Sequence, residues 1–143
     1  MTRDCWEQAA RRHQQDAQTL LGATPPAYAN ADQLYGYCAD SVLNVIADVA
    51  NEATGRPFAA TDKVHVNARW AELASFRQTA KLTEHLKSLP RSNPFADWHV
   101  SQRYGCDHKI SKDAVTAHQK AAAKLLSVLE SLRVAGILKK KSP

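Results

Sequence analysis

The chain has 143 residues, the length of one typical domain, with 44% apolar and 23% charged residues. This balance excludes a disordered, collagen-like or low-complexity chain, and no apolar run approaches the roughly 18–20 residues of a membrane-spanning helix. Its 19 basic and 14 acidic side chains give a net charge of +5, and leaving out Lys139, Lys140 and Lys141 near the C-terminus leaves +2. The charge therefore permits a nucleic-acid partner without arguing for one.

A first helix is predicted over about residues 4–21. Apolar residues recur there at steps of three and four, as they do on one face of an α-helix. Gly22 is expected to end this helix because glycine tolerates the positive φ that closes a last turn, and the Pro25-Pro26 pair cannot continue it. The residues of the apolar face are Trp6, Ala9, Ala10, His13, Ala17, Leu20 and Leu21.

A second helix is predicted from Asn30 to about Gly55. The Asn30 side chain can accept a hydrogen bond from the amides of the first turn, and Gln33 stands where a capping-box partner would. Gly55, followed by residues 56–57, Arg-Pro, ends the helix. The buried stripe of this helix is Leu34, Cys38, Val42, Val45, Ile46 and Val49, with Tyr35, Tyr37 and Ser41 flanking it.

A third helical region is predicted over residues 64–89, where the apolar phase drifts through residues 77–80. The drift indicates a kink or a break into two helices. Residues 90–110 form an irregular connection with about one turn of helix, and the last helix begins after Ser111 as N-cap and ends at Gly136. The apolar face of the last helix is Val115, His118, Ala122, Leu125, Leu126, Leu129 and Leu132.

These elements predict an all-α fold. No alternation typical of strands extends over more than four residues, and no repeat or linker divides the chain. We expect an up-and-down bundle of four principal helices over residues 1–138, followed by a basic tail at 139–143. The long loop before the last helix is the expected place for function, because long loops in compact domains are often functional.

Reactive side chains concentrate in the loop at residues 98–110. Arg103 and His108 are separated by four residues and precede the electropositive N-terminus of the last helix. Arginine offers a planar fork for phosphate and histidine titrates near neutral pH, so the pair suits phosphodiester chemistry. The alternative, which spacing alone favours, is that Arg103 pairs with a carboxylate such as Asp107 and that His108 is a surface residue.

Two other chemistries are weaker at this loop. Cys106 lies near His99 and His108, but a structural zinc site usually takes a second close pair from elsewhere in the chain, and none is present. Cys106 with His108 as its base could act as a nucleophile, yet free thiols in small cytosolic proteins are mostly inert. We expect no metal and no cofactor. His13 and His118 lie on apolar helix faces, where hydrogen-bonded core histidines or semi-buried histidines are expected rather than metal ligands.

The cysteines and the N-terminus predict the compartment. Cys5, Cys38 and Cys106 are odd in number and far apart, and the polar first residues lack the apolar core of a secretory signal. These features predict a cytoplasmic protein with free thiols and no membrane association.

The order of the segments resembles HEPN domains. Residues 6–21, with a Trp, an Asp-Ala pair and a closing Leu-Leu, resemble the first HEPN helix, and residues 30–43 resemble the second. The stretch from Trp98 to Tyr104 and the Ala- and Leu-rich last helix follow in the expected order. The resemblance covers nearly the whole chain.

This resemblance implies an up-and-down bundle that forms a homodimer. In the nuclease branch, an Arg followed after four to six residues by a His lies near the start of the last helix, and two copies cut RNA without metal. By position, Arg103 would stabilise charge on the attacked phosphate and His108 would move protons. The implied function is an endoribonuclease (RNase) of the toxin or defence type.

The sequence departs from the nuclease pattern at two positions, which supports an alternative. Tyr104 follows Arg103 where Asn, Asp or His is usual, and Ile110 stands where a Tyr is frequent. The alternative is a non-catalytic HEPN module that binds a nucleotide or a partner of the nucleotidyltransferase or toxin–antitoxin type. Trp98, Tyr104 and Asp107 would then bind a ligand or anchor the loop. Arg103 is also expected to anchor it, so that Arg103→Ala would lower stability.

Overall fold

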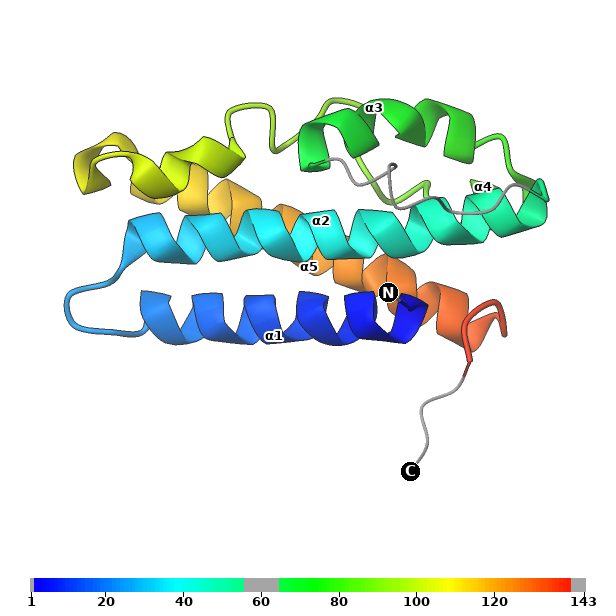
Figure 1. Cartoon of the computed structure of the whole chain (residues 1–143), viewed down its shortest axis with the longest axis horizontal. Coiled ribbons are helices and arrows are strands. Elements are labelled where there is room, and N and C mark those ends of the chain that lie inside the picture. The colour runs from blue at the N-terminus through cyan, green and yellow to red at the C-terminus, as the bar shows by residue number, and fades with distance from the viewer. Residues whose placement is uncertain (1, 56–64, 140–143) are drawn as a thin grey trace.

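The computed structural model describes residues 2–55 and 65–139, except for the side chain of His108. All regular elements within these ranges are helices, which confirms the predicted all-α fold (Figure 1). No helix among them is long and apolar enough to cross a membrane. Most of the predicted basic tail, from residue 140 onward, lies outside the described residues. The α-helices are α1 (Arg3–Leu21), α2 (Tyr28–Ala53), α3 (Val66–Phe76), α4 (Ala80–Thr83) and α5 (Lys112–Val134), with 3-10 helices η2 (Val100–Tyr104) and η3 (Asp107–Lys109) before α5.

Helix α2 is the centre of the bundle. It runs antiparallel to α1, while α5 crosses behind it and α3 lies on the side away from α1 (Figure 1). Tyr35 and Ser41, which the sequence places beside the apolar stripe, are buried in the structure. A helix covered by neighbours on several sides has no single buried stripe, so polar side chains of α2 also enter the core.

The start of α2 differs from the prediction. The helix begins at Tyr28 with Ala27 as N-cap, and no side chain caps it. The capping roles expected of Asn30 and Gln33 are therefore wrong, because both residues already lie inside the helix. Tyr28 packs against the core, which extends the helix toward the two prolines. The Gln33 side chain instead donates to the carbonyl oxygen of Val100 at 3.2 Å.

The three glycines expected to end helices do not behave alike: Gly55 and Gly136 have a positive φ, and Gly22 does not. Gly22 ends α1 at a φ of −79°, an ordinary right-handed conformation, so its expected positive φ is wrong. Gly136 has a φ of +79°, as glycine allows. Beyond it, the amides of Ile137 and Leu138 turn back to the carbonyl oxygen of Leu132, at 2.9 and 3.3 Å. The closed end brings Leu138 into the core.

The predicted break in the third helical region is confirmed. Helix α3 ends at Phe76 and the single turn of α4 begins at Ala80, while Val64, its predicted start, lies outside the described residues. The predicted cap of the last helix is confirmed as well, since the Ser111 hydroxyl accepts from the amide of Ala114 at 3.1 Å. The connection before α5 contains η2 and η3, and it carries the reactive loop predicted from the sequence.

Candidate functional site

The loop at residues 98–110 lies beside the first half of α2 (Figure 1). Its first residue, Trp98, packs into the core. The Trp98 side chain is 1% exposed, and its indole Nε1 donates to the carbonyl oxygen of Asp32 at 3.0 Å. Its own carbonyl accepts from Nδ2 of Asn67 in α3 at 2.8 Å. The indole fits because Gly36 has no side chain: a Cβ there would lie 1.9 Å from the ring. Trp98 therefore fixes the start of the loop against two helices.

A buried histidine lies beneath the loop, between two carboxylates. Nδ1 of His118 is 2.5 Å from Oδ1 of Asp32, and its Nε2 is 2.8 Å from Oδ1 of Asp97. His118 and Asp32 are 2% and 1% exposed, while the Asp97 side chain is 65% exposed. Phe95 stacks on the imidazole with ring centroids 5.0 Å apart. Ionised carboxylates only accept hydrogen bonds, so both ring nitrogens must donate, and this arrangement requires a charged imidazolium.

The pKa of His118 agrees with this geometry. Burial by itself lowers the pKa, because it disfavours the charged form. The hydrogen bonds and charges of Asp32 and then Asp97 outweigh burial and raise the pKa above its ordinary 6.5. The folded protein therefore holds this proton more tightly than an ordinary histidine does, and the hydrogen bonds of the ring join α2, α5 and the start of the loop.

Gln102 connects this buried network to η2. Its Nε2 donates to the second oxygen of Asp32, Oδ2, at 2.6 Å, while its Oε1 accepts from the amide of His99 at 3.2 Å. The His99 ring accepts from the amide of Ser101 at 3.1 Å. Because both carboxylate oxygens of Asp32 and the Gln102 amide are bonded, the backbone that carries Arg103 is fixed to α2.

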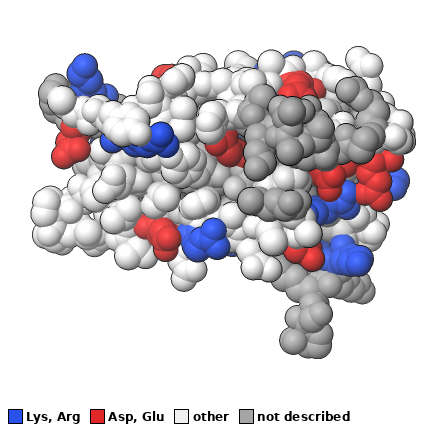
Figure 2. Space-filling model, viewed as in Figure 1, with Lys and Arg blue, Asp and Glu red and all other residues white. Residues whose placement is uncertain are grey.

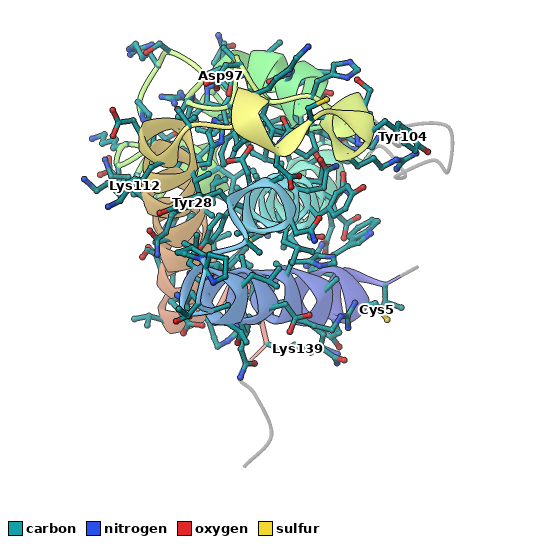
Figure 3. The ribbon with its side chains drawn as sticks, turned by 90° about the vertical axis from the view of Figure 1, so that its left-hand side faces the viewer. Cys5, Tyr28, Asp97, Tyr104, Lys112 and Lys139 are labelled. Carbon is teal, nitrogen blue, oxygen red and sulfur yellow. The ribbon has the colours of Figure 1, made fainter. Side chains whose placement is uncertain are left out.

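Arg103 extends from this fixed backbone into solvent. One of its guanidinium nitrogens, Nη1, donates to the hydroxyl of Tyr37 at 3.3 Å, and the guanidinium lies over the ring of Tyr104, 4.8 Å from its centre. Tyr104 is 79% exposed and points away from the bundle (Figure 3). Within the described part of the chain, no carboxylate pairs with Arg103, so the expected pairing with Asp107 is wrong. The guanidinium is free to take an anion.

The other predicted loop residues have less defined partners. His108 belongs to η3 by its backbone, but its side chain lies outside the described part, so the structure gives no Arg103–His108 geometry. Asp107 is exposed and its carboxylate has no partner among the described residues. Ile110 packs partly against the core. The loop is thus anchored by Trp98 and Gln102, rather than by Tyr104 or Asp107.

Arg103→Ala should leave stability unchanged, contrary to the expectation from the sequence. The side chain is exposed and it contacts only the partly exposed Tyr37 and the exposed Tyr104 among the described residues, so little is lost on truncation. The thermal midpoint of the variant should match that of the wild type, whereas Trp98→Ala should lower it clearly. A loss for Arg103→Ala as large as that for Trp98→Ala would show that Arg103 does anchor the loop.

No family model, curated protein or solved structure matches this chain. Function must therefore be inferred from the geometry of the loop and the chemistry of its residues. Acidic and basic side chains lie beside one another on the face drawn in Figure 2, so the charge of that face does not indicate a ligand. The exposed guanidinium of Arg103 is therefore a more specific indication of an anion-binding site than the net charge of the chain.

The three cysteines and His13 differ in their burial. Cys38 is buried, which raises the pKa of its thiol to about 12, whereas Cys5 and Cys106 are exposed. Across residues 2–55 and 65–139, no three His, Cys, Asp or Glu side chains gather as a metal site would require. His13 is half-buried against Tyr37, with ring centroids 5.7 Å apart, and burial followed by the charge of Arg12 lowers its pKa.

Sequence reasoning named Trp98 as a loop anchor but missed the polar residues that hold the loop. His118 was expected in the core, and an unpaired buried ionisable group is costly, so a buried acid was implied. Asp32, which lies among apolar residues in α2, was the available signal for that partner. Asp97 and Gln102 carried no such signal, since both lie in an irregular connection whose path on α2 is set by distant contacts.

Proposed function

We propose that the chain is a HEPN-like, metal-independent endoribonuclease that works as a homodimer and binds an RNA phosphate at Arg103. The observation that carries this proposal is the exposed guanidinium of Arg103, held between Tyr37 and Tyr104 and left unpaired by any described carboxylate. A fork of donors on a fixed backbone suits the non-bridging oxygens of a phosphodiester. The resemblance to HEPN nucleases supports His108 as the second residue.

The proposed reaction needs no cofactor. The ribose 2′-oxygen forms a bond to phosphorus as the bond from phosphorus to the 5′-oxygen breaks, which leaves a cyclic phosphate and a 5′-hydroxyl. One histidine removes the proton of the 2′-hydroxyl and another gives a proton to the leaving 5′-oxygen. Arg103 stabilises the extra negative charge on the phosphate oxygens in the transition state.

The proposed dimer would supply the two histidines that this reaction uses. Each copy offers one His108, whereas simultaneous proton removal and proton delivery use two histidines. Two copies that face one cleft would supply both histidines and two arginines. The dimer is testable by sedimentation of the purified protein, where a monomer at the concentration of the RNA assay would count against the proposal.

The decisive experiment is RNA cleavage in the presence of a chelator. The wild type should cut a mixed-sequence RNA and leave cyclic phosphate ends, while His108→Ala should lower the rate about a hundredfold or more. His85→Ala is the matched control, because His85 bonds Ser131 of α5 and does not lie in the loop. No cleavage by the wild type, or equal cleavage by His108→Ala, would refute the nuclease.

A non-catalytic HEPN module is the second candidate, and the exposure of Tyr104 favours it. A solvent-facing aromatic ring beside an arginine suits stacking of a nucleobase, and such binding needs no chemistry. RNA binding that is lost in Tyr104→Ala, without cleavage by the wild type, would support this module. A partner of the nucleotidyltransferase or antitoxin type would be supported instead if neither binding nor cleavage occurs and such a protein co-purifies.

A further inference from the structure

A pocket of about 240 Å³ opens between α5, Trp70 of α3 and the connection at residues 89–94, outside the site described above. Trp70 of α3 forms one wall, Pro90 and Pro94 of the connection form another, and Ala117 and Ala121 of α5 form the third. These walls are almost entirely apolar. The small alanines of α5 leave room that larger side chains would fill, and the indole and proline rings present flat surfaces.

Two lysines stand at the rim of this pocket. Lys120 and Lys124 are exposed and four residues apart on α5, so they are neighbours on one helix face. No acidic residue lines the pocket, and no carboxylate among the described residues pairs with either lysine. Two unpaired ammonium groups beside an apolar hollow are complementary to a ligand that has an apolar body and a negatively charged end.

We propose that this pocket binds a small aromatic anion, a flat ring system that carries a carboxylate or a phosphate. The ring would lie between Trp70 and the two prolines, where dispersion and area burial favour a flat apolar group. The charged group would lie between Lys120 and Lys124, within reach of both ammonium groups. The volume is below the usual range of drug-sized sites, about 300–1,000 Å³, which limits the ligand to one or two fused rings.

The pocket is separate from Arg103 in its residues but connected to the loop by packing. Trp70 contacts Phe95 with ring centroids 6.5 Å apart, and Phe95 stacks on His118. None of the pocket residues takes part in the proposed RNA chemistry. Ligand binding here and RNA cleavage at Arg103 can therefore succeed or fail independently.

The test is an NMR titration of the full chain with 2-naphthoate and, separately, 2-naphthyl phosphate. The chain has three tryptophans, so the indole N–H signal of Trp70 is assignable by its loss in Trp70→Phe. Both probes should shift this signal with saturation at millimolar concentration. The double variant Lys120→Glu/Lys124→Glu should weaken binding at least about tenfold, because two attractions become two repulsions.

Two controls make the result specific. Lys112→Glu changes the same charge on α5 without lining the pocket, and it should bind both probes as the wild type does. The uncharged 2-naphthylmethanol should bind about tenfold more weakly than 2-naphthoate. Any one of three results would overturn the proposal: no shift of the Trp70 signal, equal binding by the double variant, or equal binding of the uncharged probe.

Discussion

Replacing His118 with leucine is expected to lower the free energy of unfolding by about 3–5 kcal/mol. Leucine is of similar size but cannot donate a hydrogen bond, so the carboxylate of Asp32 would remain buried without its cation. The stabilities of small domains are about 5–15 kcal/mol, so this loss is a large part of the total. Urea denaturation of the wild type and the variant measures it directly.

Asp97→Ala is the matched control for this prediction. Asp97 bonds the opposite nitrogen of the same imidazole, but its side chain is mostly exposed, so water replaces the lost carboxylate at little cost. We expect a loss of about 1 kcal/mol or less. Equal losses for His118→Leu and Asp97→Ala would mean that the burial of Asp32 does not control the energetics of the network.

The same histidine should make stability depend on pH. Its pKa in the folded protein is raised above 6.5, so the folded state holds the proton more tightly than the unfolded chain. The stabilisation is complete below about pH 6.5 and is lost as pH rises through the folded pKa. Because the pKa of His13 is lowered in the folded protein, its effect on stability as pH rises has the opposite sign. His118→Leu should remove the decline above pH 6.5, which a urea series at several pH values tests.

The helices were largely predictable because their apolar residues recur at helical spacing. The seven apolar-face positions predicted for the last helix are all buried in α5, and the break before α4 was visible as a phase drift. The errors fall at helix ends. Asn30 has the chemistry of an N-cap, but α2 begins earlier, at Tyr28, because tertiary packing overrides a local capping preference.

The site was only partly predictable, for a different reason. The loop was located by its composition, and Arg103 was singled out by its residue type and position. Its surroundings depend on contacts across long sequence separations: the Trp98 indole donates to the backbone carbonyl of Asp32, and the Gln102 amide donates to the carboxylate of the same residue. No local pattern specifies such pairs. A single sequence therefore indicates candidate side chains for function, but not that a buried pair of His118 and Asp32 holds the loop.

Gly36→Ala is expected to destabilise the protein by about 3 kcal/mol or more, although alanine favours a helix over glycine by about 1 kcal/mol. A Cβ at this position would lie 1.9 Å from Cε2 of Trp98, whereas ordinary contacts begin at 3.4 Å. The nearest neighbour is a rigid indole in the core, so the ring must leave its site. Thermal or urea unfolding should show the loss.

Two comparisons isolate the cause of that loss. Gly22→Ala is the matched control, because its Cβ would meet only ordinary contacts at 3.6 Å and its φ suits alanine, so stability should change little. In a Trp98→Ala background, Gly36→Ala should become neutral or stabilising, since the clash is gone and the helix preference remains. If Gly36→Ala costs the same in both backgrounds, the glycine serves α2 itself rather than the loop. If Gly36→Ala instead destabilises the wild type and stabilises the Trp98→Ala background, the glycine is required by the Trp98 side chain. Helix α2 would then contain a helix-weakening residue because Trp98 holds the loop that carries Arg103.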